Sequence, residues 1–184
     1  MRYAHSLSMA LWVQPSVNIR EAKTNDVNEL AEVHVKSWQS AYKGLIPDDI
    51  LENINLEDRA EMWLGAIRDK PSETIVSLDS DKIVAFANFG ESRDNNGAQP
   101  NGEIRAIYVL KDYWRMCIGS ELLEYAEEFL KRKYQYAVLW VLDSNDRAIK
   151  FYQKQGYAKD GAEKTETLFE VTLSEIRMVK TINS

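Results

Sequence analysis

Hydrophobic residues recur along the chain with two different periods, which predicts a mixture of strands and helices. They alternate with polar residues over residues 17–22, as expected of a strand. After Thr24-Asn25-Asp26, which suit a helix N-terminus, they recur three and four positions apart and predict a helix. The apolar face of this helix comprises Val27, Leu30, Ala31, His34 and Trp38. Two further helices are predicted over residues 47–54, which open on Pro47, and over residues 56–69.

The pattern changes after Pro71, where short apolar runs replace the helical period. Runs at 74–78 and 83–89 predict a hairpin, and a polar turn over 94–102 leads into a strand over 103–110. Residues 137–142 are apolar throughout, as in a buried parallel strand. Between these last two strands lies an amphipathic helix that begins near Gly119. A short helix over 145–155, closed by Gly156, precedes two strands at 157–162 and 167–180.

Residues 103–142 are therefore predicted to form strand, loop, helix and strand, with a right-handed crossover. In such a unit a ligand binds at the carboxyl end of the first strand, against the helix N-terminus. Unpaired N–H groups of the loop and of the first helical turn favour an anion, such as a phosphate. The loop contains neither GxxxxGK[ST] nor GxGxxG, so the usual nucleotide motifs are excluded.

Composition narrows the class of protein. The chain has 184 residues, 45% of them hydrophobic, which suits a single globular domain over 17–184 with residues 1–16 as a loose leader. A single cysteine cannot form an internal disulfide, so a cytoplasmic, reducing location is predicted. With only two histidines beside it, a metal site is not expected. The net charge of −6 argues against nucleic acid as a partner. No apolar run approaches the ~20 residues of a membrane span.

Three segments together resemble the GCN5-related N-acetyltransferase (GNAT) family over about residues 17–180. GEIRAIYVLKDYWRMCIGSELL resembles that family's central strand, pyrophosphate loop and helix. VLWVLDSNDRAIKFYQKQGY resembles its next strand and the helix that ends in Phe-Tyr-x-x-x-Gly-Tyr/Phe, and WQSAYKGLIPDDIL resembles the first two helices of a large bacterial branch. The resemblance implies an α/β fold of the α+β type, with a mixed, mostly antiparallel sheet, a central parallel βαβ unit and flanking helices. It also implies acetyl-coenzyme A as co-substrate, without a metal.

The resemblance assigns coenzyme-binding roles to residues of this chain. The family's loop pattern, Gln/Arg-x-x-Gly-x-Gly/Ala, falls on residues 114–119, with Trp114 at the first position and Cys117 at the first glycine. Loop N–H groups are expected to hold the pyrophosphate of coenzyme A; they belong to Arg115, Met116, Cys117, Ile118, Gly119 and Ser120. The pantetheine arm is expected to pair with the backbone of one strand as an added strand and to bond one side chain of the following helix. These residues are Ile107, Tyr108 and Val109 on the strand, and Asn145.

The implied reaction is direct attack of a primary amine on the thioester in a ternary complex. Such an amine has a pKa of ~10.4 and must lose a proton first. Glu103 is the expected general base, with Glu91 as a second candidate, although Glu103 could also be a surface residue at a strand start. A backbone N–H of Val109 is expected to stabilise the oxyanion. Tyr152 is expected to protonate the leaving thiolate, with Phe151 turned into the core; packing against the sheet is the structural alternative for Tyr152.

Aromatic residues of the N-terminal helices are candidates for an acceptor site, because their faces attract cations. These candidates are Trp38, Tyr42 and Trp63, and the alternative role for each is packing in the core. His34 is expected to be a structural histidine with a hydrogen-bond partner. The carboxylates of Asp48 and Asp49 could meet a cationic acceptor or serve only their helix N-terminus.

Other functions remain open from the sequence. Trp114 and Cys117 depart from the loop pattern, and a side chain at a glycine position takes room beside a phosphate. A degenerate domain that binds coenzyme A as a sensor or interaction module is therefore the main alternative, and an enzyme for another phosphorylated ligand is a third. Cys117 as a nucleophile is disfavoured, because no histidine is near and the loop faces the pyrophosphate. The acceptor, a small molecule or a peptide, is unidentified, and a homodimer through the strand at 167–180 is open.

Overall fold

The computed structural model describes residues 17–70, 72–94, 100–168 and 171–183, and this part of the chain folds around one seven-stranded sheet. The strands are β1 (Val17–Glu21), β2 (Glu73–Asp79), β3 (Lys82–Glu91), β4 (Gly102–Val109), β5 (Tyr136–Leu142), β6 (Ala158–Leu168) and β7 (Val171–Thr181). They lie in the order β1-β2-β3-β4-β5-β7-β6, and only β4 and β5 are parallel neighbours. The predicted mixed, mostly antiparallel sheet with a central parallel pair is confirmed.

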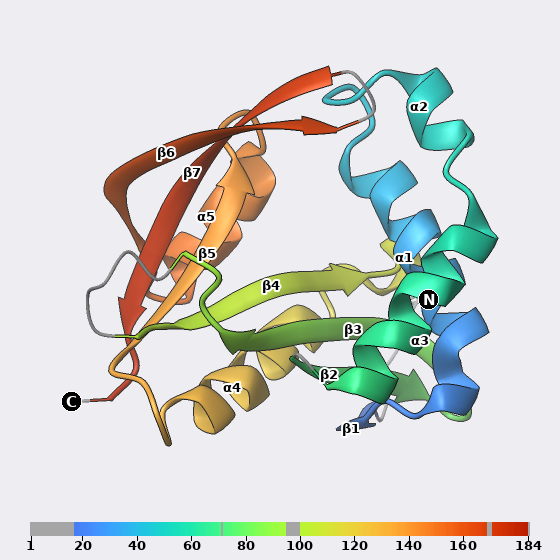
Figure 1. Ribbon diagram of the computed structural model, residues 1–184, viewed down its shortest axis with the longest axis horizontal. Helices are drawn as coiled ribbons and strands as arrows, with labels where there is room; N and C mark the ends of the chain where they lie inside the picture. The colour runs from blue at the N-terminus through green and yellow to red at the C-terminus, as the bar shows by residue number, and fades with distance from the viewer. Residues whose placement is uncertain (1–16, 71, 95–99, 169–170, 184) are drawn as a thin grey trace, which may run out of the picture.

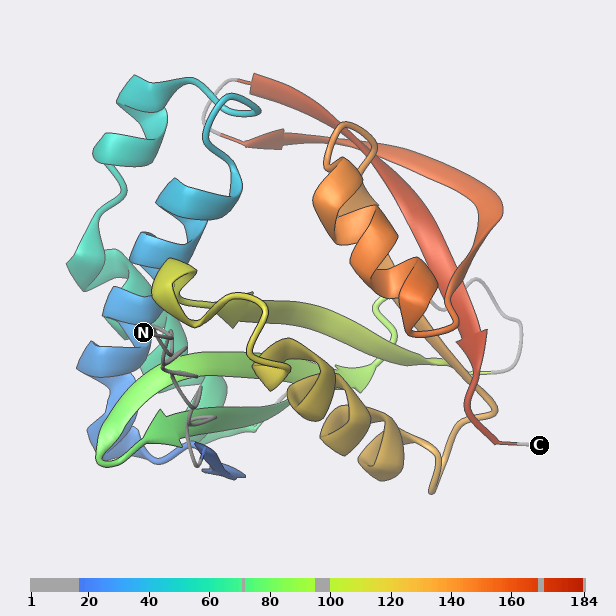
Figure 2. The ribbon, with the colours of Figure 1, turned by 180° about the vertical axis from the view of Figure 1, so that it is seen from behind.

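Helices cover both faces of the sheet, as a comparison of Figures 1 and 2 shows. The helices are α1 (Val27–Ala41), α2 (Asp48–Glu52), α3 (Leu56–Asp69), α4 (Ile118–Leu130) and α5 (Asp146–Lys154), with 3₁₀ turns at Thr24–Asp26 and Lys111–Tyr113. α1 and α3 lie on one face, and α4 and α5 on the other. Strands β2 and β3 are therefore buried almost continuously, which explains their unbroken apolar runs.

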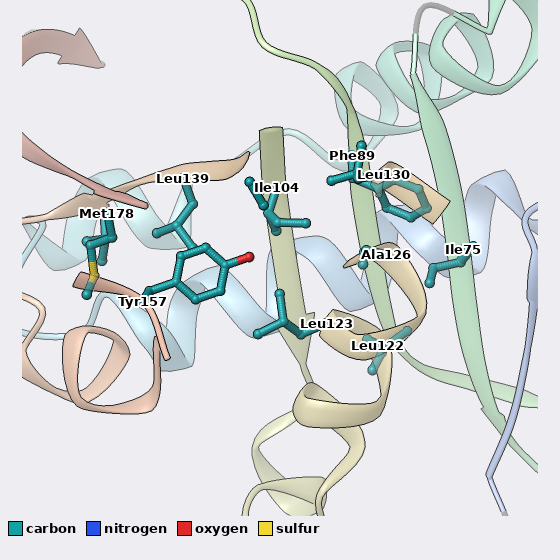
Figure 3. Close-up of a cluster of buried hydrophobic side chains, with 14 of the residues drawn as sticks. Ile75, Phe89, Ile104, Leu122, Leu123, Ala126, Leu130, Leu139, Tyr157 and Met178 are labelled. Atoms are coloured by element: carbon teal, nitrogen blue, oxygen red, sulfur yellow. The ribbon is translucent and has the colours of Figure 1, made fainter. Parts of the chain in front are cut away.

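The larger of two apolar cores lies between the sheet and α4 (Figure 3). Leu122, Leu123, Ala126 and Leu130 share one face of α4, because residues three, four and eight positions apart align on a helix. They pack on the strands beside Ile75, Phe89 and Ile104. A second core on the opposite face joins α1 and α3 to β2 and β3, and it includes Leu30, Trp63 and Phe86.

Most predicted elements are confirmed, but the bounds of the last two strands differ from the prediction: β6 is longer than predicted and β7 is shorter. β6 extends to Leu168 instead of ending at residue 162, and β7 begins at Val171 instead of residue 167. β6 is the edge strand and carries mainly polar residues, so it lacks the apolar alternation that marks a strand. β7 pairs with β5 on one side and β6 on the other, so the strand proposed for a dimer contact has neither edge open over these pairs.

Two predictions fall on undescribed residues. The leader over residues 1–16 lies outside the described residues, as does most of the polar turn, over residues 95–99. Within the described ranges, no helix is both long enough and apolar enough to cross a membrane.

The site lies at the point in the middle of the sheet where the neighbouring strands β4 and β5 separate, which we call the fork. β4 and β5 pair only where Gly102 faces Ala137 and Glu103 faces Val138, and beyond this point the two strands diverge (Figure 1). At the fork α4 presses closely on β4: a Cβ on Gly102 would lie 2.9 Å from Cδ2 of Leu130. The remainder of β4 therefore has β3 on one side and an opening on the other.

Candidate active site

A cleft of about 720 Å³ fills the opening between β4 and β5. Its walls come from β4, the loop before α4, β5 and α5, and the end of α1 and one residue of β7 close its far side. Of the residues expected to bind coenzyme, all but Met116 line this cleft, and Met116 packs against the main core. Segments more than sixty residues apart in the sequence thus meet where the parallel pair opens.

The backbone of β4 is turned towards the cleft at the two expected positions. The N–H of Leu110 donates to the carbonyl of Val84 at 3.0 Å, next to the pair formed by Val109 and Ala85. In an antiparallel ladder, residues alternate between bonding the neighbouring strand and pointing away from it. Val109 and Ile107 consequently point their N–H and C=O groups away from β3 and into the cleft. Tyr108 faces β3 with its backbone and lines the cleft with its side chain.

The loop before α4 presents unpaired N–H groups. Arg115 and Cys117 have φ angles of 66° and 64°, and Cys117 is the N-cap of α4. In the described part of the chain, the N–H groups from Arg115 through Gly119 make no hydrogen bond. Ser120 departs from the expectation, because its N–H donates to the carbonyl of Cys117 at 2.9 Å. Five successive donors at the positive end of a helix are suited to an anion.

Trp114 anchors this loop to the end of β4. Its indole Nε1 donates to the carbonyl of Val109 at 2.8 Å, and the guanidinium of Arg147 on α5 lies 3.8 Å from the ring centroid. A tryptophan at the first position of the loop pattern therefore does not disorder the loop. It ties the loop to one wall of the cleft and contacts the opposite wall.

Asn145, the N-cap of α5, and Tyr152, near the end of the same helix, both line the cleft. The side-chain oxygen of Asn145 accepts from the N–H of Ala148 at 3.2 Å and caps α5, which leaves its amide NH₂ for a ligand. Burial raises the pKa of Tyr152 above its ordinary value of 10.0, and nearby Tyr42 raises it further, so the hydroxyl is protonated at neutral pH. Phe151 was expected to face only the core, but both rings line the cleft and both pack on the core.

Glu103 does not line the cleft. Its side chain is 1% exposed, and Arg93 holds it through Nη2 at 2.5 Å and through the backbone N–H at 2.9 Å. The surface alternative for Glu103 is therefore wrong, and its burial and its ion pair with Arg93 argue against the role of general base. Glu91, at the end of β3, lies outside the lining as well.

Sequence reasoning missed the carboxylate that does reach the cleft. Glu175 of β7 lies opposite Leu142 of β5, and it is the single carboxylate among the described lining residues. Nothing in the local sequence marks it, because its position depends on which strand β7 pairs with.

The N-terminal helices contribute a polar, aromatic wall. The hydroxyls of Tyr42 and Tyr108 lie 2.9 Å apart, and Tyr42 lines the cleft with Ser37. Trp38 packs against Tyr42 without lining the cleft, and Trp63 is buried in the second core. Asp48 and Asp49 lie in the first turn of α2, also outside the lining.

His34 is a partnered structural histidine, as predicted. Its Nδ1 accepts from Nε1 of Trp63 at 3.0 Å. Burial, and secondarily the charge of Arg59, lowers the pKa of His34 to about 3, so the ring is neutral. In the described ranges no cluster of His, Cys, Asp and Glu side chains could hold a metal ion. The thiol of Cys117 is exposed at the loop, and His34 lies on the opposite face of the sheet.

Known proteins share this sequence pattern and fold. Residues 28–157 match the model of the acetyltransferase (GNAT) family. An uncharacterised N-acetyltransferase of Bacillus subtilis, YuaI, is 33% identical over 138 residues, which are 74% of this chain and 78% of that protein. A spermidine N(1)-acetyltransferase of Thermoplasma acidophilum is 24% identical over 172 residues, 84% of this chain and 96% of that protein. The crystal structure of PaiA N-acetyltransferase from Thermoplasma acidophilum, in complex with coenzyme A, superposes with a TM-score of 0.72 at 24% identity, covering 90% and 99% of the two chains.

Proposed function

The chain belongs to the acetyltransferase (GNAT) family, and we propose that it transfers an acetyl group from acetyl-coenzyme A to a primary amine within a ternary complex. The observation that carries the proposal is the open edge of β4 beside the five unpaired N–H groups from Arg115 to Gly119. The edge of β4 offers backbone hydrogen-bond partners to the extended, amide-bearing pantetheine arm. The five N–H groups offer hydrogen-bond donors to the pyrophosphate. The relative named for spermidine makes a polyamine one acceptor to consider, alongside other small amines and peptides.

The residues of the cleft fit coenzyme A. Ile107 and Val109 turn backbone groups into the cleft, where they would pair with the pantetheine amides as an added strand does. The amide NH₂ of Asn145 faces the same space. The pyrophosphate would lie at the start of α4, where Arg115, Lys150 and other cationic side chains add favourable charge.

Acetyl-coenzyme A supplies the activated acetyl group, and the chain positions it and handles protons. Two N–H groups of β4 that point into the cleft, those of Ile107 and Val109, are the candidates to stabilise an oxyanion. Tyr152 is protonated at neutral pH because its pKa is raised, so it can donate to the departing thiolate sulfur. The amine attacks as the neutral base from the opposite side, where Tyr42 and Tyr108 line the cleft, and the proton that its nitrogen loses as the amide forms passes to solvent.

Tyr152→Phe tests transfer against mere binding. The substitution removes the proton donor and leaves the ring, so we expect the turnover number to fall by about a hundredfold while acetyl-coenzyme A still binds in the micromolar range. Titration calorimetry measures binding, and release of free thiol measures turnover. Tyr125→Phe is the matched control, because this exposed tyrosine of α4 lies outside the cleft.

The two outcomes that contradict the proposal are distinct. If the natural chain does not bind acetyl-coenzyme A even at millimolar concentration, the cleft belongs to another ligand. If acetyl-coenzyme A binds but no amine in a broad panel releases thiol, the chain is a coenzyme-binding module, as the departures at Trp114 and Cys117 would suggest.

A further inference from the structure

The charges along the cleft are unevenly distributed. Arg115, Arg147, Lys150 and Lys154 line it beside the loop and along α5, where they suit the phosphates of a coenzyme. Glu175 is the one carboxylate among the described lining residues, and it lies on β7 at the side where α1 ends. A carboxylate has no use in binding phosphates. Its presence calls for a different partner, and that partner is a cation.

The surroundings of Glu175 form a site for an alkylammonium group. Nζ of Lys164, a primary ammonium, lies 3.3 Å from Oε2 of Glu175 and 4.4 Å from the ring centroid of Trp140. Trp140 and Glu175 both line the cleft, while Lys164 reaches them from β6. A carboxylate beside an aromatic face is the combination that holds an ammonium ion. The contacts of Lys164 therefore show that Glu175 and Trp140 together can hold a primary ammonium group.

Lys164 can move away from Glu175 and Trp140, whereas these two side chains are held in place. The side chain of Lys164 is 33% exposed on the edge strand, but that of Glu175 is only 19% exposed. Indole Nε1 of Trp140 donates to the carboxylate of Asp94 at 2.5 Å, which fixes the ring. Arg177 also approaches this ring, but its Nε is held by Asp160 at 2.7 Å. Lys164 is thus the exchangeable member of the group.

The charge of Glu175 is felt across the cleft. Burial raises the pKa of Tyr42, the hydrogen bond with Tyr108 lowers it, and the charge of Glu175 raises it again. The carboxylate therefore acts on the hydroxyl of Tyr42, where the charge of Arg147 lowers the pKa and partly opposes it. An acceptor that enters between these walls meets aromatic rings on one side and a negative charge on the other.

We infer that Glu175 binds an ammonium group of the acceptor other than the one that is acetylated, and that this second ammonium replaces Lys164. The inference rests on the proposed transferase function. The reacting nitrogen must be neutral when it attacks, so an ion pair to it would be lost, whereas a second ammonium remains charged throughout. The acceptor class is then a small diamine or polyamine, and amines with an acidic tail are rejected.

Three four-carbon amines that differ only in their tails test this inference. The full chain is saturated with coenzyme A, so that no turnover occurs, and is titrated calorimetrically with putrescine, n-butylamine and γ-aminobutyrate. Their tails are positive, neutral and negative. We expect putrescine to bind at least about tenfold more tightly than n-butylamine, and γ-aminobutyrate to bind most weakly.

Variants identify the residue responsible. Glu175→Gln should remove the difference between putrescine and n-butylamine, and Lys164→Met should strengthen putrescine binding severalfold by removing the internal competitor. Lys159→Met is the matched control, because Lys159 is exposed on the same strand and does not line the cleft. Equal affinity of the natural chain for putrescine and n-butylamine would overturn the inference. So would an equal weakening of all three amines by Glu175→Gln. A failure of the proposed function shows itself separately, as the absence of coenzyme A binding or as the absence of thiol release from acetyl-coenzyme A with every amine.

Discussion

Two residues of the loop before α4 adopt a backbone conformation that suits glycine. Arg115 and Cys117 have φ angles of 66° and 64°, and both carry side chains. A side chain in the left-handed region costs roughly 1–2 kcal/mol, because Cβ approaches the following carbonyl. This strain persists because Trp114 and α4 hold the loop at its two ends. The loop thus keeps the shape of a glycine loop at a cost in stability.

Relief of this strain is measurable at Cys117. Cys117→Gly should raise the free energy of unfolding by about 1 kcal/mol, because glycine adopts positive φ freely, although it also gains entropy when unfolded. Urea denaturation monitored by tryptophan fluorescence measures the change. Cys117→Ala is the control, since it removes the thiol and keeps Cβ. A gain for alanine equal to that for glycine would show that the thiol, and not the backbone, is the source.

The elements meet most tightly at the fork. Gly102 pairs with Ala137 in the first of the two pairs that β4 and β5 share, and Leu130 at the end of α4 lies directly over it. A methyl group on Gly102 would come within 3.1 Å of three atoms of Leu130, a fully buried side chain. The absence of a side chain on Gly102 therefore allows α4 to lie this close to β4 next to the opening of the sheet.

Gly102→Ala tests this close approach. We expect it to lower the free energy of unfolding by about 1–3 kcal/mol, because α4 must shift or Leu130 must leave its rotamer. Gly65→Ala is the matched control: Gly65 lies in α3 with open space around it, and alanine there should stabilise by about 1 kcal/mol through helix propensity. Chemical denaturation of both variants gives the comparison. An alanine that is neutral at both positions would contradict the packing argument.

The local sequence pattern predicted most helices and strands correctly. It failed for features that depend on which strands pair with each other across the sheet. The helix over residues 56–69 agrees with α3, because its capping residue and apolar spacing are both local signals. The polar edge strand β6 was predicted too short, since its stability comes from pairing with β7. In the same way, Glu103 was chosen as a base from its place on β4, and Glu175 was overlooked. Which carboxylate faces the cleft depends on strand order, which local sequence does not encode.

On the scale of the whole molecule, overall charge and local charge oppose each other. The chain carries a net charge of −6, which repels an anionic coenzyme, whereas the mouth of the cleft has Arg115, Arg147, Lys150 and Lys154. Screening acts over about 10 Å at 0.1 M salt. If added salt weakens coenzyme binding, attraction by the cationic side chains of the cleft dominates. If added salt strengthens binding, repulsion by the net charge dominates.

We expect the local charges to dominate. Raising salt from about 0.05 M to about 0.5 M should weaken coenzyme A binding severalfold, as measured by calorimetry. The double variant Lys150→Gln/Lys154→Gln should flatten this dependence. Lys133→Gln/Lys159→Gln makes the same change in net charge at exposed positions outside the cleft and should leave the slope unchanged. Binding that strengthens with salt would mean that the net charge governs the encounter.

The opening between β4 and β5 also bears on aggregation. An exposed strand edge is a template on which other chains can add strands, and proteins protect such edges. Here the unpaired side of β4 lies in the middle of the sheet, walled by α5, by the tryptophan-anchored loop and by the end of α1. A second polypeptide with bulky side chains would be excluded, whereas a narrow, unbranched amide chain can enter. The walls of the cleft thus protect this edge against self-association and leave it accessible to a narrow, unbranched chain.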